Sequence, residues 1–147
     1  VASLIQSAGF EMTRRRAGDQ PRGQVYLADT LGELGTWYAL SNLVFLGGSL
    51  LPIGGHNPFE VAQAGGITLA GPHVTNFAET YAEMHSAGAA LEAGDTEAIV
   101  ARITQLLSDE NARQTARSAA QGFAAARADQ LDSNALRVIK VLGLSDG

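Results

Sequence analysis

A glycine-rich stretch followed by a polar turn is the part of this sequence best suited to binding chemistry. Residues 47–55 hold four glycines directly after an apolar run, and His56, Asn57 and Glu60 follow. Glycine permits a positive φ and lets a ligand approach the backbone closely. A helix beginning near Asn57 would turn its N–H groups, with about half a positive charge, toward a phosphate. The stretch predicts binding of a nucleotide or phosphorylated ligand, with Glu60 accepting hydrogen bonds from sugar hydroxyls, although close packing of a strand on a helix would use the same glycines.

A second contact surface lies in Asp29-Thr-Leu-Gly-Glu33. We expect this segment to enter a helix, and Gly32 in a first helical turn is unfavourable by about 1 kcal/mol relative to alanine unless something approaches closely. A flat base laid against Leu31 and Gly32, with Glu33 nearby, would explain the glycine. The segment therefore predicts a second side of the same nucleotide site.

Three turns share a spacing that also has a purely structural interpretation. In each, a capping residue stands three positions before a glutamate: Thr30 before Glu33, Asn57 before Glu60, and Asn76 before Glu79. This is the spacing of a capping box, in which the glutamate reaches back to the N–H of the capping residue. Capping alone is the favoured interpretation for Glu79. For Glu33 and Glu60 the surrounding glycines favour a ligand.

The histidines and the basic residues are distributed unevenly. All three histidines lie between Gly23 and Leu91, a stretch without lysine or arginine, so a phosphate bound there must rely on backbone N–H groups. Of the three, His56 could donate to a phosphate, His73 could line the same crevice, and His85 is expected at the surface. A cationic clamp must come from residues 14–16, from Arg22, or from sequence outside this chain. No His, Asp and Glu spacing fits a metal site, and neither GxGxxG nor Gly-Lys-Ser/Thr is present.

Short apolar segments alternate with helical ones along the chain. Strands are expected at residues 24–28, 43–46, 67–70 and 89–91, and helices at about 30–40, 58–64, 77–86 and 95–107. A helix ending at Gly9 and an edge strand within 10–16 precede them, and a helical tail over 108–144, broken near 128–132, follows. Strands apolar on both faces and separated by helices are typical of a parallel sheet covered on both sides. We therefore predict an α/β fold with a Rossmann-like, doubly wound parallel sheet.

Composition limits the remaining possibilities. The chain has 147 residues, of which 46% are hydrophobic and 17% charged, and this predicts a folded chain. We interpret residues 1–147 as one partial domain, with a core to about residue 107 and C-terminal helices over about 108–144. No apolar run is long enough to cross a bilayer, so a soluble fragment is expected. The absence of cysteine excludes disulfides and thiolate zinc sites, and the net charge of −5 argues against nonspecific nucleic-acid binding. Because the chain begins with Val1, we expect a piece of a longer protein.

Four blocks of residues resemble a known enzyme family. They are Asp29-Thr-Leu-Gly-Glu-Leu34, Phe45-Leu-Gly-Gly-Ser-Leu50, Gly54-Gly-His-Asn-Pro-Phe-Glu60, and Gly71-Pro-His73 with Asn76-Phe77. In order and spacing they resemble the bacterial 3-deoxy-D-manno-octulosonic acid (Kdo) transferases of lipopolysaccharide biosynthesis. The resemblance covers nearly the whole chain, corresponds to about the last third of a family member, and is weakest after Thr96.

The resemblance implies the C-terminal half of a GT-B glycosyltransferase. The family's donor is CMP-Kdo, its acceptor is a lipid A precursor at the cytoplasmic face of the bacterial inner membrane, and its inverting reaction uses no metal or cofactor. Carried over by motif, the donor-binding residues are Leu31, Gly32, Glu33, Gly55, His56, Asn57, Pro58, Phe59 and Glu60. The family's catalytic base, acceptor surface and membrane contact belong to an N-terminal domain. A Pro-Arg-His block that precedes the matching region in the family is also missing. No catalytic residue is therefore assigned, and the isolated fragment is expected to be inactive.

Two other functions fit the same residues. Another GT-B enzyme, one that uses a UDP-sugar, shares the strand–turn–helix plan and a ribose-binding glutamate, and it predicts a preference for UDP over CMP. A non-catalytic α/β binding module would use the glycines only for packing, and it predicts no nucleotide binding. An NAD-binding Rossmann domain is disfavoured because its fingerprint is absent.

Overall fold

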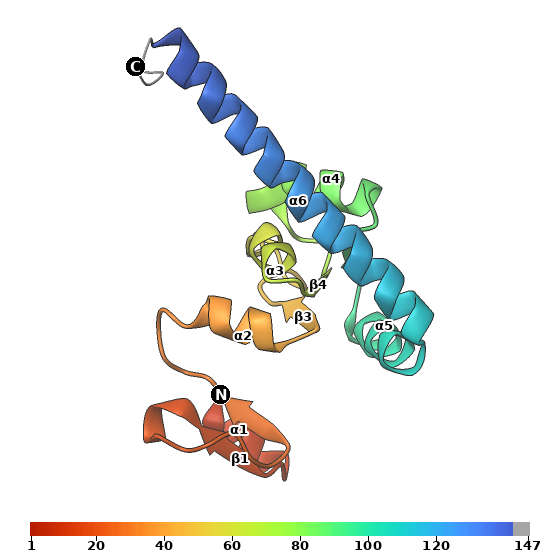
Figure 1. The fold of residues 1–147 in the computed structure, drawn as a ribbon. Coiled ribbons are helices and arrows are strands. Elements are labelled where there is room, and N and C mark those ends of the chain that lie inside the picture. Colours follow the sequence, from red (N-terminus) through yellow and green to blue (C-terminus); the bar gives the residue numbers. More distant parts are fainter. Residues whose placement is uncertain (143–147) are drawn as a thin grey trace. The chain divides into compact units, whose positions relative to one another are not determined.

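Parallel strands and helices alternate along the chain, as the sequence predicts. The structure is a computed structural model, and it describes residues 1–142 (Figure 1). The chain divides into two compact units, one of them Val1–Leu34 and the other beginning at Gly35. The prediction of one partial domain over residues 1–147 stays a prediction.

The first unit carries two short parallel strands. Helix α1 (Ala2–Ser7) is followed by Ala8 and by Gly9, whose φ is +79°. Then come strand β1 (Met12–Arg14), the short 3-10 helix η1 (Arg15–Ala17) and strand β2 (Val25–Leu27). Met12 pairs with Val25 and Arg14 with Leu27. Because the two strands are parallel and in register, the residues that follow Arg14 and those that follow Leu27 leave the sheet at the same edge.

The second unit is built on a three-stranded parallel sheet. Its strands are β3 (Leu43–Leu46), β4 (Ile67–Ala70) and β5 (Ala90–Glu92), in the order β3-β4-β5. The predicted bounds of β3 and β4 are confirmed. All four residues of the central strand β4 are buried, as expected for a parallel strand covered on both faces. The parallel α/β fold is thus confirmed, with its strands divided between two sheets.

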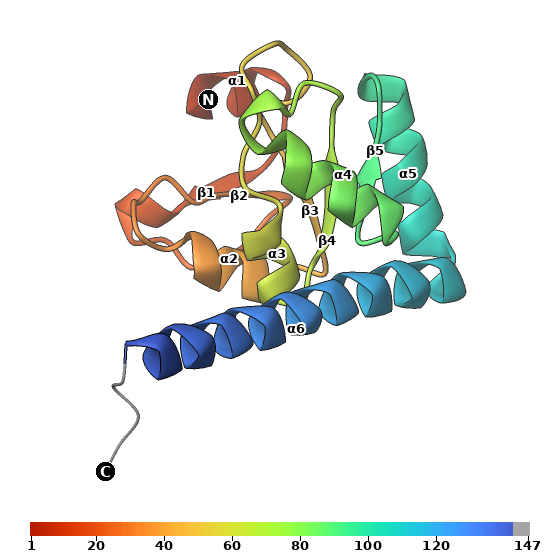
Figure 2. The same ribbon diagram turned by 90° about the horizontal axis from the view of Figure 1, so that it is seen from above.

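Helices connect and cover the strands of the second unit. They are α2 (Leu34–Leu40), α3 (Phe59–Gln63), the 3-10 helix η2 (Thr75–Phe77), α4 (Ala78–Ser86), α5 (Thr96–Ser108) and α6 (Glu110–Val141). Asp95 caps α5 by accepting a 2.8 Å hydrogen bond from the Ala98 N–H. Figure 2 shows α6 running across both α3 and α5.

The C-terminal helix departs from the prediction. A break near residues 128–132 was expected, but α6 runs without interruption for 32 residues. The physical reason is composition, since residues 124–142 contain neither glycine nor proline and alanine is the strongest helix former. The part of the predicted tail beyond residue 142 lies outside the described residues.

Small side chains let α6 approach the rest of the second unit. Ala120 of α6 is fully buried in a cluster with Tyr81 and Met84 of α4. Since alanine brings the helix backbone close to its neighbours, many weak dispersion contacts form along α6. None of the helices within residues 1–142 is both long enough and apolar enough to span a membrane.

Candidate functional site

The loop between β3 and α3 needs its glycines for its own backbone. Gly48, Gly54 and Gly55 have φ of +69°, +109° and +73°, a region that side-chain-bearing residues rarely adopt. The Gly55 N–H donates to the Gly48 carbonyl at 3.0 Å and closes the loop. A Cβ on Gly55 would lie 3.2 Å from the Cα of Val74. Close packing therefore explains Gly55 without any ligand.

The start of α3 is organised by Asn57. Its Oδ1 accepts a 3.1 Å hydrogen bond from the Phe59 N–H, and its Nδ2 donates to Glu60 Oε1 at 3.1 Å. The pairing predicted from the spacing therefore exists, but it joins the two side chains rather than Glu60 and the backbone. The helix begins at Phe59 and has five residues. A helix this short has little of the macrodipole that the sequence analysis expected. An anion here would therefore be bound by individual backbone N–H groups.

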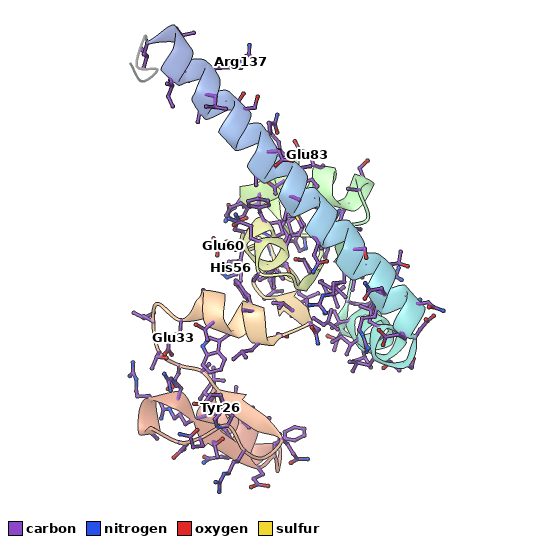
Figure 3. The ribbon with its side chains drawn as sticks, in the orientation of Figure 1. Tyr26, Glu33, His56, Glu60, Glu83 and Arg137 are labelled. Carbon is purple, nitrogen blue, oxygen red and sulfur yellow. The ribbon has the colours of Figure 1, made fainter. Side chains whose placement is uncertain are left out.

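The nine predicted donor-binding residues differ in exposure. His56 and Glu60 are exposed and lie on the same side of α3 (Figure 3). Pro58 is buried, and its carbonyl accepts a 3.3 Å bond from the Thr68 hydroxyl. The Phe59 ring packs edge-on against Phe123, with centroids 6.3 Å apart. Within this segment His56 and Glu60 thus offer side chains to a ligand, whereas Pro58 and Phe59 hold the helix in place.

Two residues that sequence reasoning missed hold this loop. The Ser49 side chain is fully buried, donates to the Leu46 carbonyl at 2.6 Å and accepts from the Gly71 N–H at 2.8 Å. The Tyr81 hydroxyl donates to the His56 carbonyl at 3.2 Å. Burial raises the pKa of Tyr81 to about 12, so its hydroxyl stays a donor at neutral pH. A lone serine among apolar and glycine residues was the available signal for Ser49, but no local pattern indicated Tyr81.

The turn after β4 joins the glycine loop at the carboxyl edge of the sheet. The His73 N–H donates to the Ser49 carbonyl at 2.9 Å, and the Asn76 N–H donates to the Gly54 carbonyl at 3.0 Å. His73 thus lies beside this loop, and its role in lining the ligand crevice stays a prediction. Asn76 does not cap α4, because Phe77 holds that position and no side chain makes a capping bond.

The expectation that His85 is a surface residue is wrong. Its side chain is half-buried, and its ring centroid lies 5.7 Å from that of Tyr81. Because residue 85 is on the face of α4 that also carries Tyr81, one helical turn earlier, it packs inward.

In the first unit, the 29–33 segment is a turn and not the start of a helix. Helix α2 begins only at Leu34, and Gly32 has φ +82°. The glycine is therefore required by the turn's backbone, which corrects both its placement in a helical turn and the capping interpretation of Thr30 and Glu33. Leu31 at the tip is 98% exposed, and a Cβ on Gly32 would meet nothing within 4 Å. The tip is open to a ligand.

Ion pairs fix both ends of the 29–33 turn. The Arg15 guanidinium binds the Glu33 carboxylate through Nη2–Oε1 at 2.7 Å and through Nε to both oxygens at 3.2 Å, and the Thr30 hydroxyl also donates to Glu33. Asp29 accepts from Arg14 Nε at 2.5 Å and from the Arg16 N–H at 3.1 Å. Two of the four arginines predicted as a possible clamp, Arg14 and Arg15, are therefore bound to carboxylates.

These contacts favour the charged carboxylates. The hydrogen bond from Arg15, then that from Thr30, lowers the pKa of Glu33 below its ordinary 4.5. Desolvation opposes ionisation of Asp29, but the hydrogen bonds from Arg14 and from the Arg16 N–H outweigh it and lower its pKa below 3.8.

We expect the first unit to lose stability in acid through these two carboxylates. A pKa lowered by folding stabilises the folded state above the unfolded pKa, and this stabilisation is lost as the pH falls through the lowered folded pKa. Carbon-13 NMR titration should place the Glu33 midpoint below 4.5, and Arg15→Gln should move it upward. A Glu33 midpoint that does not respond to Arg15→Gln would contradict the ion pair. Among the side chains of residues 1–130, 133–139, 141 and 142, no group of three or more His, Asp and Glu could hold a metal ion.

Curated relatives match most of the chain, although no protein-family model matches it. A 3-deoxy-D-manno-octulosonic acid transferase of Bordetella pertussis is 38% identical over 131 residues, which are 87% of this chain and 31% of the relative. The enzyme of the same name from Haemophilus influenzae is 33% identical over 117 residues, which are 78% of this chain and 27% of the relative. The chain is homologous to the Kdo transferases. It spans about a third of the length of these relatives.

A solved structure gives the likeness in three dimensions. The C-terminal CMP-Kdo binding domain of WaaA from Acinetobacter baumannii superposes with a TM-score of 0.78 at 35% identity, covering 82% of this chain and 64% of that one. The match supports the C-terminal half of a GT-B glycosyltransferase as the fold of this Kdo transferase homologue. The assignment of its nine donor-binding residues stays a prediction.

Proposed function

We propose that this chain is the donor-binding part of an inverting Kdo transferase and that it binds CMP-Kdo. The observation that carries the proposal is the structural likeness to a CMP-Kdo binding domain at 35% identity. The homology to Kdo transferases over most of the chain supports it. These relatives do not favour a UDP-sugar enzyme or a non-catalytic module.

In this proposal each group of predicted residues has its own task. Exposed Glu60, oriented by the Asn57 amide, can accept hydrogen bonds from the ribose hydroxyls. The open tip formed by Leu31 and Gly32 offers the base an apolar face, with Glu33 beside it. His56 and the N–H groups near Asn57 are available to the phosphate. These contacts would orient the donor, and the catalytic base is expected in the N-terminal domain of the family.

The wider setting is part of the same proposal. The whole enzyme transfers Kdo to a lipid A precursor at the cytoplasmic face of the bacterial inner membrane, and it needs neither metal nor cofactor. The acceptor and the membrane surface then contact the N-terminal domain. The 147-residue chain alone should bind donor and show no Kdo transfer.

Titration of the chain with CMP tests the proposal, with UMP and AMP as controls. We expect selective CMP binding, with amide NMR shifts concentrated at Leu31–Glu33 and Asn57–Glu60. Calorimetry on the same samples gives the dissociation constants. Preference for UMP would favour the UDP-sugar enzyme, and a folded chain that binds no nucleotide would favour the non-catalytic module.

A further inference from the structure

Three consecutive arginines follow β1, and they differ in what their side chains bind. Arg14 is bound to Asp29 and Arg15 to Glu33, as described above. The Arg16 side chain is exposed, and among the side chains that the structure describes no ion pair joins it to a carboxylate. Chemically identical neighbours therefore have different structural roles, and this makes Arg16 a natural control for Arg15.

The turn that Arg14 and Arg15 hold has an unusual tip. Leu31 is 98% exposed and Gly32 is open, while the residues on either side are held by charged hydrogen bonds. Because β1 and β2 are parallel, the arginines and this turn both follow the carboxyl ends of their strands, where ligands of open α/β sheets bind. An apolar tip whose turn is already held in place is suited to contact with a ligand, because binding then does not have to pay the entropy cost of ordering the turn.

We propose that Arg15 is a positioning residue for the nucleotide: it holds the Glu33 carboxylate, and with it the Leu31–Gly32 tip, in the orientation that receives the base. This inference rests on the proposed function and deepens it. The contact uses both Nε and Nη2, so the planar guanidinium fixes the direction of the carboxylate as well as its charge. A carboxylate has about four acceptor positions, and Arg15 and Thr30 take most of them. Glu33 thus acts chiefly through the tip that it holds.

The test compares CMP binding by wild type, Arg15→Gln, Arg15→Lys and Arg16→Gln. Both glutamine variants remove one positive charge from adjacent positions, so they change the long-range field alike. We expect Arg15→Gln to weaken CMP binding about tenfold, the scale of one charged hydrogen bond, and to lower the ratio of CMP to UMP affinity. Arg16 has no ion pair with Glu33, and any contact that it makes with the phosphate is the same for both nucleotides, so Arg16→Gln should leave that ratio unchanged. Arg15→Lys keeps the charge but loses the two-nitrogen contact, and it should fall between wild type and Arg15→Gln.

Two further readouts separate positioning from folding. In Arg15→Gln without ligand, the amide signals of Leu31 and Gly32 should move while those of Asn57 and Glu60 stay in place. The ratio of CMP to UMP affinity should also fall, because the base loses an ordered contact. If Arg15→Gln loses the β1 and β2 amide pattern, Arg15→Lys decides the question by the same two readouts.

The outcomes distinguish this inference from the function on which it rests. A wild-type chain that does not bind CMP overturns both. A wild-type chain that binds CMP, together with Arg15→Lys of wild-type affinity and selectivity, overturns only the positioning role. An equal fall of the CMP to UMP affinity ratio in Arg15→Gln and Arg16→Gln would likewise overturn it, because the effect would then not depend on the contact with Glu33.

Discussion

Gly71→Ala is expected to destabilise the second unit by about 3 kcal/mol, at the upper end of what overpacking costs. A Cβ at Gly71 would overlap the Ser49 carbonyl, and it would lie 2.7 Å from the Ser49 carbonyl carbon and 2.9 Å from the Leu50 nitrogen. These are backbone atoms, and they cannot rotate away as the end of a side chain can. The same region holds the bond from the Gly71 N–H to the Ser49 hydroxyl, so relief of the overlap would strain a buried hydrogen bond.

Denaturant unfolding followed by tryptophan fluorescence measures this effect. Trp37 is the single tryptophan and lies in α2, so it reports on the second unit. Gly94→Ala is the matched control, because a Cβ there meets nothing within 4 Å and Gly94 has no positive φ. It should leave stability unchanged or raise it by a few tenths of a kcal/mol. Equal stability of the two variants would contradict the close approach of the turns after β3 and β4.

The apolar strands and the capped helices were the parts of the fold that sequence could predict. Leu43–Leu46 and Ile67–Ala70 are short apolar runs bounded by polar or glycine residues, and their predicted ends agree with the structure. Asp95 marked the start of α5 because its side chain accepts a local backbone hydrogen bond. Both signals act within a few residues. The predicted break of the C-terminal helix at residues 128–132 was wrong. A few polar residues in an exposed, alanine-rich helix do not interrupt it.

Contacts within one short segment of the candidate site could be predicted from the sequence. Contacts between residues far apart in the sequence could not. The pairing of Asn57 with Glu60 follows from a spacing of three. The same spacing misled at Thr30 and Glu33, because Gly32 takes a positive φ and delays the helix to Leu34. The partners of Glu33 and Asp29 come from an arginine run 13 to 18 residues earlier, and no local pattern links them.

Glu60→Gln is expected to weaken CMP binding by roughly thirtyfold, or about 2 kcal/mol, the scale of a hydrogen bond to a charged group. The glutamine has the same shape, and its carbonyl oxygen can still accept from Asn57 Nδ2, so α3 should keep its start. What the variant loses is the negative charge that strengthens hydrogen bonds from the ribose hydroxyls. Isothermal titration calorimetry with CMP and with 2′-deoxy-CMP measures this, and wild type should prefer CMP more strongly than the variant does.

Glu79→Gln provides the matched control for that experiment. Glu79 is exposed, lies in the first turn of α4 and follows an asparagine by three residues, so it repeats the sequence context of Glu60. The Asn57 amide contacts Glu60, whereas α4 has no side-chain cap at its start. Removal of the same charge at Glu79 should therefore leave CMP affinity within about twofold, since exposed charges interact only weakly through water. Equal losses in the two variants would assign the effect to net charge and would contradict the proposed hydrogen bonds between Glu60 and the ribose. A loss confined to Glu60→Gln, with the preference for CMP over 2′-deoxy-CMP reduced, would locate the ribose at the start of α3.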